Sequence, residues 1–507
     1  MSDLTDRVRR SLEDATRREF DRRVETQAAF LREQLDSGAL DNGDFAVGLE
    51  LEAYATDADG RLVAVPERVL GIEGCAGELG RHNVEINTPA TLLDGAGLDD
   101  QTRALRGRLA EARRAARTAD RRLVLDAMWT VPPDEGSREY LAAVEERDGV
   151  VLAANMRPSP RYHALDNAIL AERGGSIDVD LPGLELSLPT ILVESLATSM
   201  QPHLQIPRAE AFPAYYNAAI RTMGPVLALA TNSPFAPADL YPAVEGTDAH
   251  ALVDATYHEL RVPVFERAIN VDEEGKVRFP GDVESAADVI DRIAADRTQA
   301  PFLSEWTRET NDEYTDRFPE FEHKRGTYWR WLRGVIGGQP IDGANDERSL
   351  RIEYRPLPTQ PSVEDTVGLQ ALVAGLLRGL VATDHPLATL GWDDAREGFY
   401  DVVRDGFDAE VIWMTADGEP TSDPGAVYGE LFDVARRGLR DSGVSRSAVE
   451  GYLAPIERRV ERETTPSRWK VARVRDRIDD GADLREAIRG MQREYVERAG
   501  EPFVAWS

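Results

Sequence analysis

The sequence contains very little cysteine and lysine. Its single cysteine, Cys75, excludes an intrachain disulfide and a zinc site built from several thiolates, and it fits a reducing cytoplasm. We interpret Cys75 as a small packing residue. Of the 60 basic residues only three are lysines, against 91 acidic residues, and the formal net charge is −31.

This acidic excess restricts the partners that we expect. Nucleic-acid binding needs a net basic surface, so we predict no nucleic-acid partner. An acidic surface with so little lysine fits a cytoplasm at high salt, where charges are screened within about 3 Å at 1 M. The alternative explanation is a soluble acidic protein from a GC-rich genome.

The sequence also lacks long apolar runs. Its first twenty residues have no apolar core of a signal peptide. The best apolar run, 368–382, is interrupted by Arg378 and falls short of the roughly 20 residues of a membrane span. We therefore expect a buried helix there, no membrane partner and a cytoplasmic protein.

The chain alternates between helix-like and strand-like patterns. Apolar residues at helical spacing predict an amphipathic helix over 3–36 that ends near Gly38. The period changes to two within 43–92, which predicts strands. Further helices are expected at 97–120, at 209–235 with a kink at Pro225, after Ser362 and through most of the last hundred residues, and further strands at 121–129, 196–207, 326–335 and 349–358.

Two segments do not fit this alternation. Residues 132–182 lack a clear period, which favours a long excursion or a lid, and residues 240–325 are acidic and mixed. Without repeats or low-complexity linkers, we predict one elaborated α+β domain. Its parts are an N-terminal helix at 1–40, a catalytic domain at 41–405 with insertions near 132–182 and 240–325, and a helical C-terminal extension at 406–507.

Four of the predicted strands carry an unusual polar face. Side chains at positions i, i+2 and i+4 of a strand share one face. The four polar faces consist of Gly48, Glu50, Glu52 and Tyr54; Asn83, Glu85 and Asn87; Gln201, His203 and Gln205; and Arg351, Glu353 and Arg355. A sheet with one face in water would explain each strand alone. The combination of carboxylates, one imidazole, amides and arginines, without Lys, Ser or Thr, favours a functional face.

A convergent group of carboxylates requires a counter-charge. Two of them about 4 Å apart repel by roughly 4 kcal/mol at an effective dielectric constant near 20. Oxygen ligands with at most one imidazole suit Mg²⁺ or Mn²⁺ better than zinc. Arg351 and Arg355 would supply planar donors for phosphate oxygens. The pattern therefore indicates phosphoryl chemistry on a nucleotide, although GxxxxGK[ST], a GxGxxG after a strand and GxSxG are all missing.

Six motifs occur in an order that identifies a family. The stretches VGLELEAY, ELGRHNVEINT, PHLQIP, LALATNSPF, LRIEYRPLPTQPSVEDTVGLQALV and WDDAREG resemble, in this order, the glutamate-cysteine ligase type 2 family. These are carboxylate-amine ligases with a glutamine-synthetase-like catalytic fold. The resemblance covers roughly residues 45–400 and leaves out the two insertions and both ends.

The resemblance implies a fold and a set of site residues. It implies an antiparallel sheet curved around a catalytic funnel, with helices on its outer face and with two or three Mg²⁺ ions held against the phosphates of ATP. The implied metal ligands are Glu50, Glu52, Glu78, Glu85, His203 and Glu353. Arg351 and Arg355 would contact phosphate or acyl phosphate, with Glu353 among the catalytic residues and Asn232 at the nucleotide. For Glu78, in a glycine-rich loop, a solvated surface carboxylate is an equal alternative.

The implied reaction is ATP-dependent amide formation through an acyl phosphate, with glutamate as the expected carboxylate and an amine such as cysteine as the acceptor. Two departures from the family pattern bear on this. Gln205 replaces the second histidine of Gly-x-His-x-His, and Ala127, Met128 and Trp129 replace a small Gly-Thr-His stretch. Gln205 keeps a hydrogen-bonding group but argues against full metal coordination at this motif, and the bulk of Met128 and Trp129 argues against the acceptor pocket of the family and therefore against cysteine as acceptor.

Two other functions remain open at this point. One is a guanidino phosphotransferase on the same fold. The other is a ligand-binding or regulatory protein that has lost turnover, which the altered Gln205 motif favours slightly. Arginines in the stretch YWRWLRG, 328–334, belong either to a core strand or to the nucleotide pocket, and the terminal helices could either mediate a homo-oligomer or pack within the chain.

Overall fold

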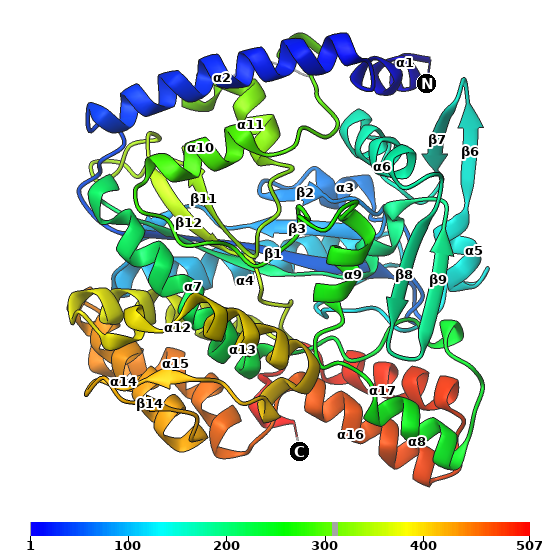
Figure 1. The fold of residues 1–507 in the computed structure, drawn as a ribbon. Coiled ribbons are helices and arrows are strands. Elements are labelled where there is room, and N and C mark those ends of the chain that lie inside the picture. Colours follow the sequence, from blue (N-terminus) through cyan, green and yellow to red (C-terminus); the bar gives the residue numbers. More distant parts are fainter. Residues whose placement is uncertain (1, 307–312, 507) are drawn as a thin grey trace.

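The computed structural model describes residues 2–306 and 313–506, and a large antiparallel sheet forms its centre (Figure 1). Strands follow one another in the order β11, β12, β10, β1, β3, β2, and the short strands β4 and β5 pair with the two ends of β1. The strands of this sheet are β1 (Ala46–Thr56), β2 (Cys75–Gly77), β3 (Asn83–Asn87), β4 (Thr91–Leu92), β5 (Arg122–Val124), β10 (Met200–Gln205), β11 (Leu332–Ile336) and β12 (Leu350–Tyr354).

The register of this sheet aligns the polar faces that the alternation predicts. Glu52 pairs with Glu85, and Gly48 pairs with His203, which itself pairs with Glu353. Directly paired residues in an antiparallel sheet project to the same side. The four polar faces therefore form one continuous surface, and the predicted α+β fold class with an antiparallel sheet is confirmed.

Helices cover the opposite, apolar face of the sheet (Figure 1). These are α4 (Gly95–Arg117), α7 (Phe212–Ala230) and α12 (Val363–Ala382). The predicted capping box starts α12, because the Ser362 hydroxyl accepts a hydrogen bond from the Asp365 backbone N–H. By length and composition α12 could cross a membrane, but 83% of its most apolar stretch is buried inside the molecule, as expected of a core helix.

A second set of helices lies on the polar side of the sheet (Figure 1). The N-terminal segment forms two helices there instead of the single helix that the periodicity predicts, since the chain breaks at Leu12 and Glu13. The helices of this side are α1 (Ser2–Ser11), α2 (Asp14–Asp36), α6 (Pro160–Glu172), α9 (Arg261–Ile269), α10 (Ala287–Ala295) and α11 (Pro319–Arg325).

The segment 132–182, for which we expect a long excursion or a lid, consists largely of regular elements. The segment folds into α5 (Ser137–Ala142), the hairpin of β6 (Val144–Arg147) and β7 (Val150–Ala153), helix α6, and β8 (Ile177–Leu181), which pairs with β9 (Leu184–Leu188). The strands and α5 are too short to give a clear periodic signal, and α6 gives none because residues 163–170 are all buried. Helix α6 carries residues of the site described below.

The C-terminal residues are mostly helical, as predicted, and pack under the sheet-covering helices (Figure 1). Helices α14 and α15 contact α12, and α16 contacts α8 and α17. The remaining elements are α3 (Glu67–Leu70), α8 (Gly246–Asp254), α13 (Trp392–Asp405), β13 (Trp413–Met414), β14 (Pro420–Thr421), α14 (Pro424–Asp441), α15 (Arg446–Glu461), α16 (Pro466–Asp479) and α17 (Leu484–Arg498).

A buried ion pair joins α12 to α15. Arg459 Nη2 lies 2.7 Å from Asp365 Oδ1, and both side chains are 0% exposed. The second amino group of Arg459 donates to the Leu229 carbonyl and to Gln360 Oε1, each at 2.8 Å. Both amino groups of the guanidinium are therefore hydrogen-bonded, its Nε has no partner among the described residues, and Asp365 supplies its counter-charge.

We expect Asp365→Ala to lower the free energy of unfolding by about 3–5 kcal/mol, because it leaves the Arg459 charge buried without its partner. Chemical denaturation would measure the change. Glu364→Ala, which removes an exposed pair with Arg106, is the matched control and should cost less than about 1 kcal/mol. Equal midpoints for Asp365→Ala and the wild type would contradict this account.

Candidate active site

Three predicted ligands from three strands meet at the centre of the polar face. Glu50 of β1, His203 of β10 and Glu353 of β12 each place a ligand atom within 4.8 Å of the other two. His203 Nε2 lies 3.2 Å from Glu50 Oε1. Among the described residues this is a group with the donor set and spacing of a cation site.

His203 has an unusual hydrogen-bonding state. Its buried Nε2 has no hydrogen-bond partner, although Glu50 faces it. On the other side of the ring, Arg351 Nε donates to His203 Nδ1 at 3.0 Å. A neutral imidazole that accepts at Nδ1 carries its proton on Nε2, so coordination of a cation by Nε2 requires Arg351 to leave Nδ1.

Two arginines hold the Glu353 carboxylate. Arg333, its neighbour on β11, contacts both carboxylate oxygens, with Nη2 3.0 Å from Oε1, and Arg355 donates to Oε1 as well. Arg355 also donates to Gln201 Oε1 at 2.6 Å. Burial opposes the ionisation of Glu353, but the two guanidinium groups hold its pKa well below the ordinary value. Glu353 is therefore a fixed anion at this face.

A second acidic group lies beside the first. Glu52 accepts hydrogen bonds from the Ser199 backbone N–H at 2.9 Å and from its hydroxyl at 3.1 Å. Glu78 accepts from the Tyr162 hydroxyl of α6 at 3.4 Å. Glu85 accepts from Asn87 at 2.7 Å. These carboxylates have few cationic partners, in contrast to Glu353.

The protonation of this group reflects its surplus of negative charge. Burial together with Glu78 raises the pKa of Glu52 to about 7. Burial raises the pKa of Glu194, which lies in the 3-10 helix at 191–196, to about 8, with further contributions from Glu78 and Glu52. Burial and the neighbouring carboxylates also raise the pKa of Glu85 well above its ordinary value.

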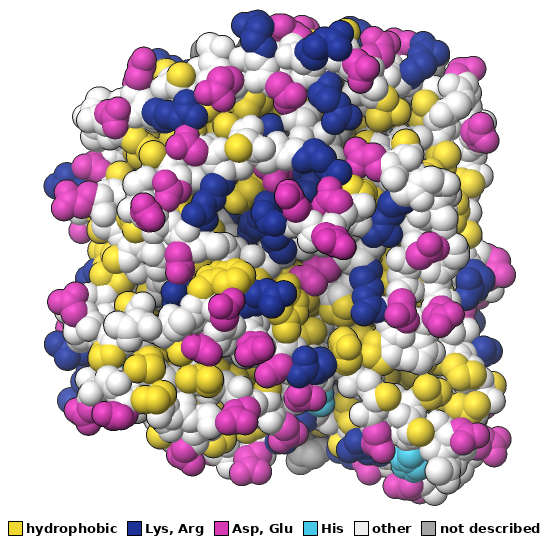
Figure 2. Space-filling view, in the orientation of Figure 1, with side chains coloured by type: hydrophobic (Ala, Val, Ile, Leu, Met, Phe, Trp, Pro, Cys, Tyr) yellow, Lys and Arg dark blue, Asp and Glu magenta, His cyan; other side chains and the backbone are white. Residues whose placement is uncertain are grey.

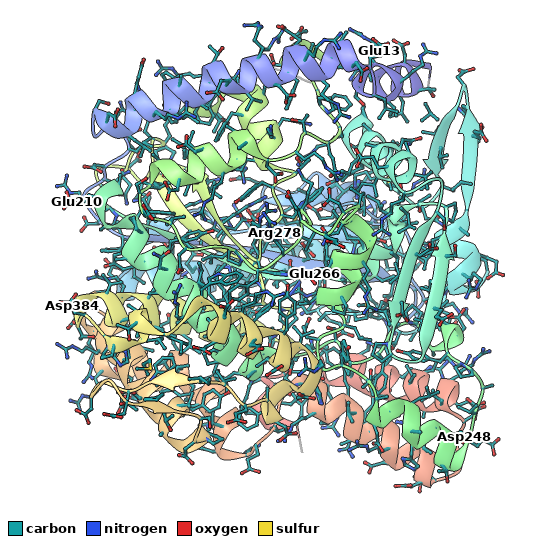
Figure 3. All side chains as sticks on the ribbon, viewed as in Figure 1. Glu13, Glu210, Asp248, Glu266, Arg278 and Asp384 are labelled. Atoms are coloured by element: carbon teal, nitrogen blue, oxygen red, sulfur yellow. The ribbon has the colours of Figure 1, made fainter. Side chains whose placement is uncertain are left out.

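The polar face opens into two cavities that meet at Glu50. The large cavity, about 480 Å³, is lined by Gly48, His203, Gly337 and Arg351 among others. The small cavity, about 230 Å³, contains the second acidic group together with arginines and aromatic side chains. Figure 2 shows Lys and Arg side chains gathered around the middle of the molecular face in front of the sheet, and Figure 3 places Arg278 there.

The donor set of the face fits hard divalent cations. Glu50, His203 and Glu353 offer two carboxylates and one imidazole, and Glu52, Glu78 and Glu85 offer three carboxylates. Mg²⁺ and Mn²⁺ prefer such oxygen-rich sites. His203 Nε2 has no hydrogen-bond partner among the described residues, so it could coordinate a cation once Arg351 leaves Nδ1. The raised pKa values of the second group are consistent with positions where a cation would supply the missing counter-charge.

The structure brings most of the sequence-predicted residues together, but it separates the two arginines. Arg355 lines the small cavity with Glu52, Glu78 and Glu85, whereas Arg351 lines the large one. Glu78 is within the acidic group and not on an open surface. Asn232 lines neither cavity: it is 0% exposed and donates to the Thr359 carbonyl and the Tyr495 hydroxyl, so we do not include it in the proposed site.

The positions that depart from the family pattern lie away from the acidic groups. Gln205 lines the large cavity but donates to the Asp44 carbonyl at 3.0 Å and to Asn345 Oδ1 at 2.7 Å. Met128 and Trp129 are buried in the core, where Trp129 packs on Tyr54 with ring centroids 5.3 Å apart. They line neither cavity, so their bulk does not narrow the site.

Sequence reasoning missed several residues of the site. Arg333 lies in the stretch 328–334, which we interpret as a core strand or part of a nucleotide pocket. The available signal was its strand pattern, which puts Arg333 on the same face as Trp331 and opposite Leu332. Glu194 lies in a 3-10 helix. Arg161 lies on α6, within the segment 132–182 for which we expect an excursion or a lid. For these two residues no local pattern pointed to the site.

The fold and this donor set together point to the class of carboxylate-amine ligases. Residues 46–502 match the family model of glutamate-cysteine ligase family 2 (GCS2), and the chain belongs to this family. The match continues well beyond residue 400, so it includes the C-terminal helices that the six motifs do not reach. A search of curated proteins finds no match.

Comparison with solved structures finds similarity to the following two proteins, both at low sequence identity. Glutamate–cysteine ligase from Francisella tularensis, in complex with AMP, is 13% identical, covers 92% of this chain and 91% of its own, and has a TM-score of 0.49. A bifunctional glutathione synthetase from Pasteurella multocida is 14% identical with a TM-score of 0.49, and the match covers 93% of this chain and 55% of that protein.

The protonation of the second acidic group predicts a cation effect that depends on pH. Glu52 binds a proton more tightly in the folded chain than at its ordinary pKa of 4.5. Its contribution to stability is complete below about pH 4 and is lost as the pH rises through about 7. We therefore expect Mg²⁺ to raise the melting temperature more at pH 8.5 than at pH 5.5.

Thermal unfolding in molar KCl, which screens the surface charge, would measure this difference. Glu85→Gln should reduce the Mg²⁺ effect at pH 8.5, and Glu210→Gln, at an exposed position labelled in Figure 3, is the matched control that should leave it unchanged. An equal Mg²⁺ effect at both pH values would contradict the assignment of these carboxylates to a cation site.

Proposed function

We propose that this protein is an ATP- and Mg²⁺-dependent carboxylate-amine ligase that activates glutamate, or a closely related amino acid, as an acyl phosphate. The observation that carries the proposal is the convergence of Glu50, His203 and Glu353 within 4.8 Å, with Glu50 lining both cavities, His203 lining the large one and Glu353 buried behind them. Membership of a ligase family supports the reaction class. A junction of this kind can hold reacting groups that come from two different pockets.

The sizes of the two cavities support the assignment of a different substrate to each. The large cavity has the volume of a typical ligand site and suits the nucleotide, with Arg351 beside His203 to bind phosphate oxygens. The small cavity suits a compact amino acid, and Arg333 and Arg355 lie on its wall. Glu50 lies between the two, where the γ-phosphate and the substrate carboxylate would meet.

The reaction consists of two displacements. A carboxylate oxygen of the substrate attacks the γ-phosphorus, the bond to the β,γ-bridging oxygen breaks, and ADP leaves. The amine nitrogen then attacks the acyl carbon, its C–O bond to phosphate breaks, and phosphate leaves while the amine proton passes to solvent or a basic group. Arg333 and Arg355 are placed to bind the charge of the transferred group, so the contribution of the chain is positioning and electrostatics.

The residues that would hold divalent cations are Glu50, His203 and Glu353 on one side and Glu52, Glu78 and Glu85 on the other. Bound there, Mg²⁺ or Mn²⁺ would neutralise phosphate charge and orient the phosphates. The chain holds two of these carboxylates in fixed orientations, because two arginines bind Glu353 and Ser199 donates to Glu52.

The test is phosphate release from ATP by the purified protein in molar KCl with Mg²⁺, glutamate and a panel of amines that includes cysteine. Hydroxylamine joins the panel because it traps an acyl phosphate as a hydroxamate whatever the natural acceptor is. We expect amine-dependent phosphate release, and Glu50→Gln and Glu353→Gln should reduce kcat by at least about a hundredfold, since each removes charge at the reacting groups.

Glu210→Gln is the matched surface control and should keep full activity. Far-ultraviolet circular dichroism and melting temperature show whether Glu353→Gln folds, because it leaves Arg333 and Arg355 without their carboxylate. If ATP binds but no amine, hydroxylamine included, causes turnover, the ligase proposal fails and a binding or regulatory role replaces it. Phosphorylation of a guanidino compound would instead establish the phosphotransferase.

A further inference from the structure

Two charged side chains on the wall of the small cavity have no partner. Of the charged residues that line it, Arg161 and Glu194 make no side-chain hydrogen bond or ion pair with any residue in 2–306 or 313–506. The other arginines of this wall are all engaged: Arg261 with Glu259, Arg325 with Glu322, Arg330 with Asp296, and Arg333 and Arg355 with Glu353. One cation and one anion are thus available to a ligand without the loss of an existing ion pair.

The fold leaves space for the Arg161 guanidinium. The guanidinium packs over Gly326, and a Cβ on residue 326 would lie 2.0 Å from Arg161 Nη2. Gly326 has φ −60° and ψ −15°, which any residue adopts, so its backbone does not require glycine. The missing side chain instead creates the groove in which the guanidinium lies.

The position of Arg161 on α6 adds to the positive potential. It is the second residue of this 13-residue helix, and Tyr162 and Leu165 of the same helix also line the small cavity. The N-terminal end of a helix carries partial positive charge and favours an anionic group. The N-cap residue, Ser159, forms no capping hydrogen bond with its side chain.

We propose that Arg161 and Glu194 bind the zwitterionic head of the amino acid whose side-chain carboxylate is activated, with Arg161 on the α-carboxylate and Glu194 on the α-ammonium group. A planar guanidinium binds a carboxylate through two parallel hydrogen bonds, and an ammonium group donates to a carboxylate. Both charges lie in one cavity of about 230 Å³, which suits a substrate of the size of glutamate.

The assignment to the acyl donor, and not to the amine acceptor, follows from the chemistry. The nitrogen of the acceptor must become an uncharged nucleophile, whereas the donor keeps its α-ammonium charge throughout. The donor's distal carboxylate must reach Glu50, which lines the same cavity as Arg161 and Glu194. This inference rests on the proposed function, because it names residues that would select the substrate of that site.

The test compares three acids in the hydroxylamine assay with ATP and Mg²⁺ in molar KCl. Glutamate carries both head groups, glutarate lacks the ammonium group, and 4-aminobutyrate lacks the α-carboxylate. Wild-type protein should prefer glutamate in kcat/KM. Arg161→Met should raise KM for glutamate by about tenfold or more and remove the preference over 4-aminobutyrate, because one charged hydrogen-bonding partner is lost.

Glu194→Gln should instead remove the preference for glutamate over glutarate. Gly326→Ala should resemble Arg161→Met although it keeps the arginine, because the new Cβ displaces the guanidinium from its groove. Arg161→Lys should recover part of the preference. In all four variants KM for ATP should stay within about twofold of the wild-type value.

Arg278→Met and Glu210→Gln are the matched controls, since both residues are exposed and neither lines the cavity. Unchanged preferences in Arg161→Met and Glu194→Gln would overturn the inference. It would also be overturned if Glu194→Gln changed only the Mg²⁺ concentration needed for half-maximal activity, which would make Glu194 a cation ligand. If wild-type protein turns over none of the acids, the proposed function fails, and calorimetric titration with the same three acids still decides the inference.

Discussion

The repulsion among carboxylates on one face of the sheet is the constraint on which the rest of the site depends. The register pairs Glu52 with Glu85 and brings Glu50 next to His203, so the anions cannot move apart without breaking the sheet. Burial strengthens the repulsion, because a low dielectric screens charge poorly. The chain relieves it in two ways: arginines neutralise Glu353, whereas the group around Glu78 retains protons or takes up cations.

This division makes the two sides of the site different. On one side of Glu50 lies a roomy cavity with Arg351, and on the other a compact cavity with Arg355 and the second acidic group. Arg351 lies in β12 and Arg355 directly follows its last residue, so the two arginines flank Glu353 and this one stretch of chain supplies charges to both cavities. The junction between the cavities is therefore positioned by the central sheet, and sites built on strands position reacting groups more precisely than sites on loops.

The parts of this arrangement that repeat along the chain could be predicted from the sequence. The alternation around Glu50, Glu85, His203 and Glu353 has a period of two, and a sheet converts that period into a shared face. Arg161 and Glu194 could not be found in this way, because each reaches the cavity from an element outside the sheet whose position is set by tertiary packing. The same reason explains the helices and hairpin missed within 132–182, and the break between α1 and α2 has no marker such as proline or glycine.

The buried Lys470–Asp126 pair has a consequence for the order in which the chain folds. Lys470 of α16 contacts Asp126, which follows β5 and also accepts from Gln492 of α17 at 2.6 Å. The two ends of the ion pair are 344 residues apart in the sequence. During synthesis, Asp126 must wait for almost the whole chain to leave the ribosome before its counter-charge arrives. Until then the burial of Asp126 beside the central sheet would leave its charge uncompensated, which disfavours completion of this part of the core before α16 docks.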